Sequence, residues 1–156
     1  MDFWLGQWEV TFTSDGKETA GTNTISKHAG RIFELFTAPG SAAVYVGASI
    51  TRHDRKRGIW VQEYWDNRGY RAWYEGAWQG DRFVLDLAGR GGHEAGTMRL
   101  VWRDIAEDAL MWDNEQTKDG GKTWASTWTI AYKRLGQPQS SAEAVGPVPY
   151  QPAALA

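Results

Sequence analysis

Apolar and polar residues alternate along most of the chain. In WEVTFT, residues 8–13, a tryptophan, a valine and a phenylalanine are each followed by a polar residue. A β-strand points successive side chains to opposite faces, so this order is typical of a strand with one buried face. No long stretch repeats apolar residues with helical spacing. The pattern therefore predicts an all-β protein.

Turn-forming sequences divide the alternating stretches into short segments. The clearest are Asp15-Gly16, Asn67-Arg68-Gly69 and Asp119-Gly120-Gly121, whose residue types accept the backbone angles of tight turns. About ten strands joined by short turns indicate an antiparallel up-and-down sheet, which removes its exposed edges by closing. We expect a single β-barrel with strands near residues 8–13, 20–28, 30–37, 43–53, 59–66, 70–78, 82–87, 97–104, 110–117 and 123–134.

The composition changes near residue 136. Four of the five prolines follow this point, together with many Gln, Ser and Ala residues. Such a composition cannot bury enough apolar surface to order itself. We expect residues 1–135 to form the barrel and residues 136–156 to form a flexible Pro/Ala-rich tail.

The strand period assigns side chains to faces. In the last strand one face is predicted to be the interior, and it carries Trp124, Ser126, Trp128, Ile130, Tyr132 and Arg134. The middle strands have aromatic residues on both faces, and the preferred inward set is Trp60, Gln62, Tyr64, Tyr74 and Trp78. The opposite face, with Trp65 and Trp73, would then be covered by the tail or by a second subunit.

Aromatic residues make up 13% of the chain, including ten tryptophans. That is more than the core of one such domain needs, so several are expected to line a cavity or a second apolar surface. The net charge is −2 and no basic stripe is present, which argues against a nucleic-acid partner. The chain lacks cysteine, a bilayer-spanning apolar stretch and a secretory signal, so we expect a cytoplasmic protein without a membrane partner.

Several segments resemble a known superfamily. Gly6-Gln7-Trp8 matches the Gly-x-Trp signature of lipocalins and other calycins, and Arg134 stands where calycins place a basic residue across from that tryptophan. With DFWLGQWEV, FELF, HDRKRGIWVQEYWD and DGGKTW, residues 2–134 resemble uncharacterised bacterial lipocalin-like proteins of a domain-of-unknown-function family. More distantly they are similar to nitrobindin-like barrels. The resemblance implies a calycin-type barrel with a central cavity, a Trp8–Arg134 cation–π contact at its base and no settled activity.

Motifs for metal, haem or nucleophilic chemistry are missing from the sequence. His28, His53 and His93 lack metal-ligand spacing, and none is predicted in the middle of an inward-facing strand. We therefore expect neither a metal nor a haem, although nitrobindin holds haem through a histidine. There is no Gly-x-Ser-x-Gly elbow of a serine hydrolase. The GRGG segment, residues 89–92, is not followed by the residues of a phosphate loop, so we interpret it as a turn or a mobile lid.

Polar and aromatic residues at candidate inward positions suggest a ligand pocket. Glu34 shares a face with Ile32 and Phe36, and a buried carboxylate needs a partner, a proton or a ligand. Glu34 and Tyr64 are therefore candidate acid–base residues. The candidate ligand-binding residues are Asn23, Tyr45, Ser49, Gln62, Tyr74, Trp112, Asn114 and Trp128.

Three functions remain open at this point. The barrel could bind an apolar or aromatic small molecule between tryptophan walls. The same cavity could serve a cofactor-free cyclase, isomerase or hydratase acting on a hydrophobic natural-product-like substrate, with Glu34 as acid or base. The outer aromatic face, with Trp65 and Trp73, could instead be the surface of a homodimer.

Overall fold

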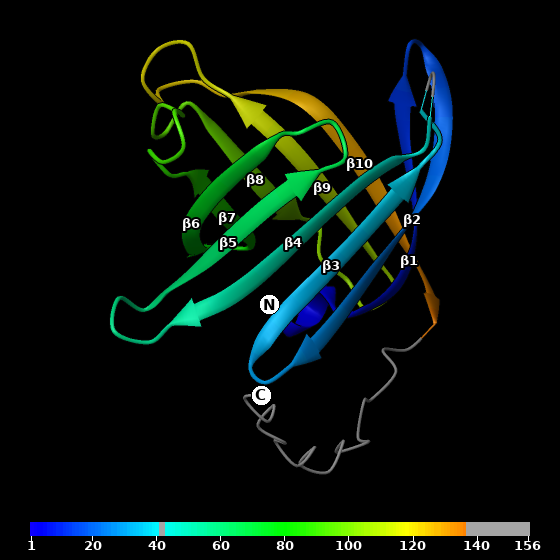
Figure 1. Ribbon diagram of the computed structural model, residues 1–156, viewed down its shortest axis with the longest axis horizontal. Coiled ribbons are helices and arrows are strands. Elements are labelled where there is room, and N and C mark those ends of the chain that lie inside the picture. The colour runs from blue at the N-terminus through cyan, green and yellow to red at the C-terminus, as the bar shows by residue number, and fades with distance from the viewer. Residues whose placement is uncertain (41–42, 137–156) are drawn as a thin grey trace, which may run out of the picture.

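Ten antiparallel strands form a closed barrel, in which each strand pairs with its neighbours in sequence and β1 pairs with β10 (Figure 1). The structure is a computed structural model and describes residues 1–40 and 43–136. Its elements are η1 (Asp2–Trp4), β1 (Gly6–Ser14), β2 (Lys17–His28), β3 (Arg31–Ala38), β4 (Tyr45–Asp54), β5 (Ile59–Asp66), β6 (Arg71–Gln79), β7 (Arg82–Leu87), β8 (Met98–Arg103), β9 (Ala109–Gln116) and β10 (Ala125–Gly136). The predicted up-and-down barrel is confirmed.

A short 3₁₀ helix, η1, precedes the first strand. The short 3₁₀ helix η1 was not predicted, and no helix within the described residues has the length and apolar character needed to cross a membrane. Gly136 ends β10. The rest of the predicted tail, residues 137–156, lies outside the described residues.

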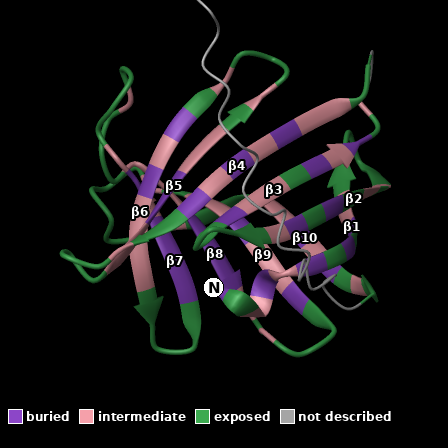
Figure 2. Cartoon of the chain, turned by 60° about the horizontal axis from the view of Figure 1, so that its bottom comes forward, coloured by how far each residue is buried: buried purple, intermediate pink, exposed green. Residues whose placement is uncertain are grey.

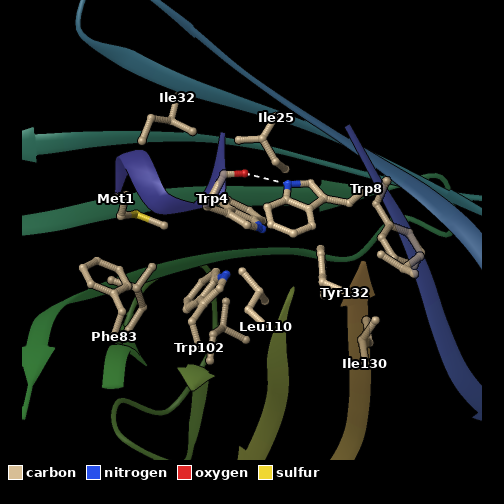
Figure 3. Close-up of a cluster of buried hydrophobic side chains, with 14 of the residues drawn as sticks. Met1, Trp4, Trp8, Ile25, Ile32, Phe83, Trp102, Leu110, Ile130 and Tyr132 are labelled. Atoms are coloured by element: carbon tan, nitrogen blue, oxygen red, sulfur yellow. Dashed lines mark hydrogen bonds between the residues drawn. The ribbon is translucent and has the colours of Figure 1, made fainter. Parts of the chain in front are cut away.

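One half of the barrel interior is packed with large aromatic and aliphatic side chains. The chain enters through η1, which lies across this end of the barrel (Figure 2). Trp4, Trp8 and Trp102 are each at most 1% exposed, and the Trp8 Nε1–H donates to the Trp4 carbonyl at 2.8 Å (Figure 3). Met1, Phe83, Leu110 and neighbouring aliphatic residues fill the remaining space. This half, the packed base, is a solid core.

The first and last strands meet at the base through Arg134. Its guanidinium carbon lies 4.0 Å from the centroid of the Trp8 ring, as the resemblance implied. The same guanidinium donates to the carbonyls of Leu5, at 2.6 Å, and of Glu107, at 2.7 Å. It also donates to the Phe3 carbonyl in η1 at 3.3 Å. One side chain therefore ties η1, β10 and the β8–β9 turn to the tryptophan. Trp8 near the start of the chain thus has a structural role, which is to join the first strand to the last.

The prediction that Trp124 and Ser126 face the interior is wrong. The β9–β10 register shifts between Ser126 and Trp128, and such a β-bulge moves the preceding side chains to the other face. Ser126 instead donates to Asp113 on the outer face, and Arg99 stacks over the Trp124 ring at 4.1 Å. Beyond the bulge, Trp128, Ile130 and Tyr132 point inward as expected.

The preferred inward face of the middle strands is confirmed. Gln62 is 1% exposed and Tyr74 is 2% exposed, and Trp60 and Tyr64 pack against the core. Trp78, at the end of β6, is 49% exposed, although its ring packs against Phe83. These side chains therefore point into the barrel, and Trp78 is more exposed because it lies at the end of its strand.

We expect Gly76→Ala to lower the free energy of unfolding by about 1–3 kcal/mol, the usual range for an overpacked site. A Cβ at Gly76 would overlap the Val84 carbonyl and come within 3.0 Å of the Leu85 Cα, and both neighbours are backbone of the paired strand β7. Denaturant unfolding measures the loss. Gly136→Ala is the matched control, since a Cβ there meets no described residue within 4 Å. An equal loss in both variants would contradict this interpretation.

Candidate functional site

The half of the barrel opposite the packed base contains a cavity of about 230 Å³. It lies toward the end where the β3–β4, β5–β6, β7–β8 and β9–β10 loops gather. Its walls come from β3 to β6, from the β5–β6 turn and from β8 to β10, and they are mostly aromatic. The lining residues are Glu34, Phe36, Tyr45, Tyr64, Tyr70, Tyr74, Met98, Leu100, Trp112, Asn114, Trp128, Ile130 and Tyr132.

A more polar pocket adjoins the cavity on its outer side. Tyr45 and Trp128 line both spaces, and Asp66 and Arg68 line only the outer one. The Arg68 guanidinium lies over the Tyr45 ring, 5.0 Å from its centroid. A molecule that enters the aromatic cavity from this side would pass these charged residues first.

Four tyrosines from β4, β5, β6 and the β5–β6 turn form a belt along one wall of the cavity. This tyrosine belt consists of Tyr45, Tyr64, Tyr70 and Tyr74. The Tyr45 and Tyr64 hydroxyls are 2.5 Å apart, and Tyr45 also donates to Asp66 Oδ2 at 3.2 Å. Since the Tyr45 proton goes to Asp66, Tyr64 donates its own proton to Tyr45. The lone pairs of Tyr64 are then free to accept a hydrogen bond from a ligand.

Burial keeps the hydroxyls of Tyr45, Tyr64 and Tyr74 neutral. It raises the pKa of Tyr45 to about 12 and raises the pKa values of Tyr64 and Tyr74 further. Donation to a neighbouring hydroxyl adds to the increase for Tyr64. Near neutral pH we therefore expect Tyr64 to act as a hydrogen-bonding group and not as a base.

Gly47 makes room for the tyrosine belt. A Cβ at this position of β4 would overlap the Tyr64 hydroxyl. Any larger residue would displace that hydroxyl from Tyr45. The missing side chain at residue 47 is therefore part of the geometry of the cavity wall.

Glu34 is the carboxylate that lines the cavity, and both of its oxygens receive hydrogen bonds. Asn23 Nδ2 donates to Oε1 at 2.8 Å and Ser49 Oγ donates to Oε2 at 2.6 Å. Gln62 Nε2 donates to Ser49 Oγ at 3.2 Å, which leaves the Ser49 proton for Glu34. The Asn23 amide also donates to the Tyr132 hydroxyl at 2.9 Å. This polar network holds the carboxylate in one orientation.

The protein environment opposes ionisation of Glu34. Burial raises the pKa of its carboxyl group, and the hydrogen bonds from Ser49 and Asn23 offset part of that increase. Tyr64 and Tyr132 face it from β5 and β10, and their own pKa values are raised by burial. They stay neutral where Glu34 titrates, so the proton on Glu34 sets the charge of the cavity wall.

The free energy of unfolding should carry a pH signature of Glu34. Because the native carboxyl group holds its proton more tightly than the unfolded chain, whose ordinary pKa is 4.5, the stability that it contributes is complete below that pH. That stability is lost as the pH rises through the native pKa. The free energy of unfolding of the wild type minus that of Glu34→Gln should therefore fall as the pH is raised above 4.5.

Denaturant unfolding across a pH series measures this difference. Glu75→Gln is the control of opposite sign, since the Arg57 guanidinium lowers the pKa of the Glu75 carboxyl group. Its stabilisation is present above the ordinary pKa and is lost in acid. The free energy of unfolding of the wild type minus that of Glu75→Gln should therefore rise with pH. If the corresponding difference for Glu34→Gln also rose with pH, the surroundings of Glu34 would not oppose its ionisation as described.

The structure brings most of the predicted site residues together. The cavity-lining residues among them are Glu34, Tyr45, Tyr64, Tyr74, Trp112, Asn114 and Trp128. Asn23, Ser49 and Gln62 are at most 2% exposed and lie behind Glu34, where they join the network that orients it. We expect these three to position Glu34 and not to touch a ligand.

Sequence reasoning did not include six lining residues in the site: Phe36, Tyr70, Met98, Leu100, Ile130 and Tyr132. Tyr70 precedes β6 and continues the inward alternation of Tyr74, so the strand period could have identified it. Met98 Sδ accepts hydrogen bonds from Tyr74 and Asn114 at 3.5 and 3.4 Å. That contact depends on three strands and leaves no pattern in the sequence.

Each of the three histidines has its own contact partner. His28 packs on Phe33, His53 packs on Trp60, and His93 Nε2 lies 2.7 Å from the Arg71 carbonyl oxygen. Among the described residues, no group of three or more His, Cys, Asp or Glu side chains is arranged to hold a metal ion. None of the three histidines is among the residues that line the cavity.

The outer tryptophans differ in how far they are covered. The Arg71 guanidinium lies over the Trp73 ring at 4.8 Å, and Gly91 of the GRGG turn also packs against that ring. Trp65 is 39% exposed. The GRGG segment thus covers part of the outer face of β6.

Comparison with models of known protein families finds no match, and comparison with curated proteins finds none either.

Proposed function

We propose that the protein binds a small apolar or aromatic molecule inside the barrel. The observation that carries the proposal is the contrast between the two halves of the interior. The base is filled by its own tryptophans, whereas the other half holds a cavity of about 230 Å³ walled by aromatic rings. Ligand sites combine such apolar walls with a few polar groups that fix orientation.

The size of the cavity indicates the size of the ligand. An apolar cavity of roughly 150 Å³ in another protein holds benzene. The cavity here, at about 230 Å³, has room for one aromatic ring with a compact substituent. Tert-butylbenzene is a probe of that size and carries no charge.

We also propose that the chain is a calycin-type barrel related to the bacterial lipocalin-like proteins. The Gly6-x-Trp8 sequence and the Arg134 guanidinium over the Trp8 ring support this relationship. The resemblance implies a barrel with a central cavity and a base closed by this pair. That arrangement agrees with the packed base and the open cavity.

Titration with tert-butylbenzene tests the binding function. Trp112 and Trp128 line the cavity, with ring centroids 5.6 Å apart, so a bound ring should change their fluorescence. We expect saturable binding with one molecule per chain by calorimetry, and a fluorescence change that Trp112→Phe and Trp128→Phe each reduce. Trp65→Phe, on the outer face, is the control and should leave the change intact. Absence of saturable binding would count against the proposal.

A second candidate function is cofactor-free acid–base catalysis in the same cavity, of a cyclase, isomerase or hydratase type. The specific observation in its favour is the part-buried carboxyl group of Glu34, which Asn23 and Ser49 hold at the cavity wall. Burial raises the pKa of this group, which makes it a stronger base and lets it hold a proton to a higher pH than an exposed glutamate does. Glu34→Gln separates the two functions, because an enzyme would lose turnover whereas a binding protein has none to lose.

The remaining expectations stay predictions. They concern the cytoplasmic location and a homodimer formed through the outer face of β5, where Trp65 is the exposed aromatic residue. Measurement of the molar mass in solution for the wild type and for Trp65→Ser tests the dimer.

A further inference from the structure

We propose that the ligand of this cavity is a small organic cation, with an ammonium group beside Glu34 and an aromatic or compact alkyl body among the rings. The inference rests on the proposed binding function and names its ligand class. Three features carry it: the hydrogen bonds around Glu34, the proton order in the tyrosine belt and the aromatic character of the walls.

The polar network is built to hold Glu34 as an acceptor. Asn23 Nδ2 donates to one carboxylate oxygen and Ser49 Oγ donates to the other. Gln62 gives Ser49 a hydrogen bond and so directs the Ser49 proton toward Glu34. Two donors placed on two oxygens favour the ionised carboxylate, and they offset part of the effect of burial, which opposes ionisation.

Tyr64 offers a second acceptor to the cavity. Its proton is used in the hydrogen bond to Tyr45, whose own proton goes to Asp66. Glu34, Ser49 and Tyr64 occupy directly paired positions on β3, β4 and β5. Glu34 and Tyr64 therefore belong to one stretch of the cavity wall, and a ligand there is best matched by hydrogen-bond donors or a positive charge.

Aromatic rings make up most of the remaining wall. Eight of the thirteen lining residues are Phe, Tyr or Trp. The face of an aromatic ring carries negative electrostatic potential and attracts cations, and quaternary ammonium ligands are recognised in this way. The walls thus favour the same charge as Glu34 does.

The described residues that line the cavity supply no positive charge to Glu34. Within the part of the chain that the structure describes, no Lys, Arg or His lines the cavity, and no ion pair involves Glu34. Burial accordingly raises the pKa of this carboxyl group. A bound cation would be the missing counter-charge and would stabilise the ionised form.

Two probes of nearly the same shape test the inference. Phenyltrimethylammonium and tert-butylbenzene differ by one central atom, nitrogen or carbon, and thus by one positive charge. Calorimetry at about pH 8, where a carboxyl group of raised pKa is more ionised, gives the affinity of each for the purified chain. We expect phenyltrimethylammonium to bind at least tenfold more tightly. Glu34→Gln should remove this advantage while leaving tert-butylbenzene binding within about threefold of wild type.

Each outcome decides between the claims. If tert-butylbenzene binds and the cation binds no more tightly, the binding function stands and the cation proposal is overturned. If neither probe binds, both fail. Glu9→Gln removes an exposed carboxylate on the outer face of β1 and serves as the matched control. If Glu9→Gln and Glu34→Gln lose the same amount of cation preference, that preference comes from the overall charge of the protein and not from Glu34. This result also overturns the proposal.

Discussion

Replacing Trp8 with alanine should lower the free energy of unfolding by about 3–5 kcal/mol, the range for truncating a fully buried large aromatic residue. Trp8 is 0% exposed. It donates to the Trp4 carbonyl, packs edge-on against Tyr132 and lies beneath the Arg134 guanidinium. The substitution would remove the side chain that joins η1, β1 and β10, and denaturant unfolding with a constant m-value would measure the loss.

Trp65→Ala is the matched control for this loss. It removes the same side chain from the outer face of β5, where Trp65 is 39% exposed. We expect it to cost about 1 kcal/mol or less, as surface substitutions usually do. Similar losses for the two variants would mean that the packed base does not carry the stability of the barrel.

Leu100→Trp should weaken tert-butylbenzene binding by about 50-fold. Leu100 is 5% exposed and lines the cavity from β8, so an indole there would take up space that the probe needs. Loss of contact for about three methyl-sized groups at ~0.8 kcal/mol each gives this factor. Calorimetry measures the affinity, and thermal unfolding should show a fold as stable as that of the wild type, because the new ring fills a void.

Leu35→Trp is the matched control for cavity filling. Leu35 lies on the outer face of β3 and is 52% exposed, so the same substitution adds an indole outside the barrel. We expect wild-type affinity for tert-butylbenzene. If Leu100→Trp also binds with wild-type affinity, the probe occupies some other place and the cavity is not the site.

The barrel was predictable because side chains alternate between the two faces of a β-sheet, so apolar residues recur at every second position in the sequence. Residues 59–66 and 82–87 were predicted as strands with the bounds that β5 and β7 have. Closure followed from short turns and the absence of a helical period, and the Trp8–Arg134 contact followed from the resemblance to calycins. These features depend on local order along the chain, which a single sequence contains.

The details of the cavity were less predictable because they depend on register between distant strands. The β-bulge near Ser126 reversed the face of Trp124, and no turn residue marks it. Asn23, Ser49 and Gln62 were recognised as inward polar residues, but only their paired positions show that they support Glu34. The fit of Gly47 against Tyr64 likewise appears only when β4 and β5 are aligned.

The most direct test of the central claim is the position of a bound aromatic probe. A crystal soaked in iodobenzene, with the iodine located by anomalous diffraction, shows where a small ring binds. We predict an iodine peak inside the barrel, in contact with Trp112, Trp128 or the tyrosine belt that lines the cavity. Iodine only on the outer surface, with the cavity filled by the protein's own side chains, would contradict the account.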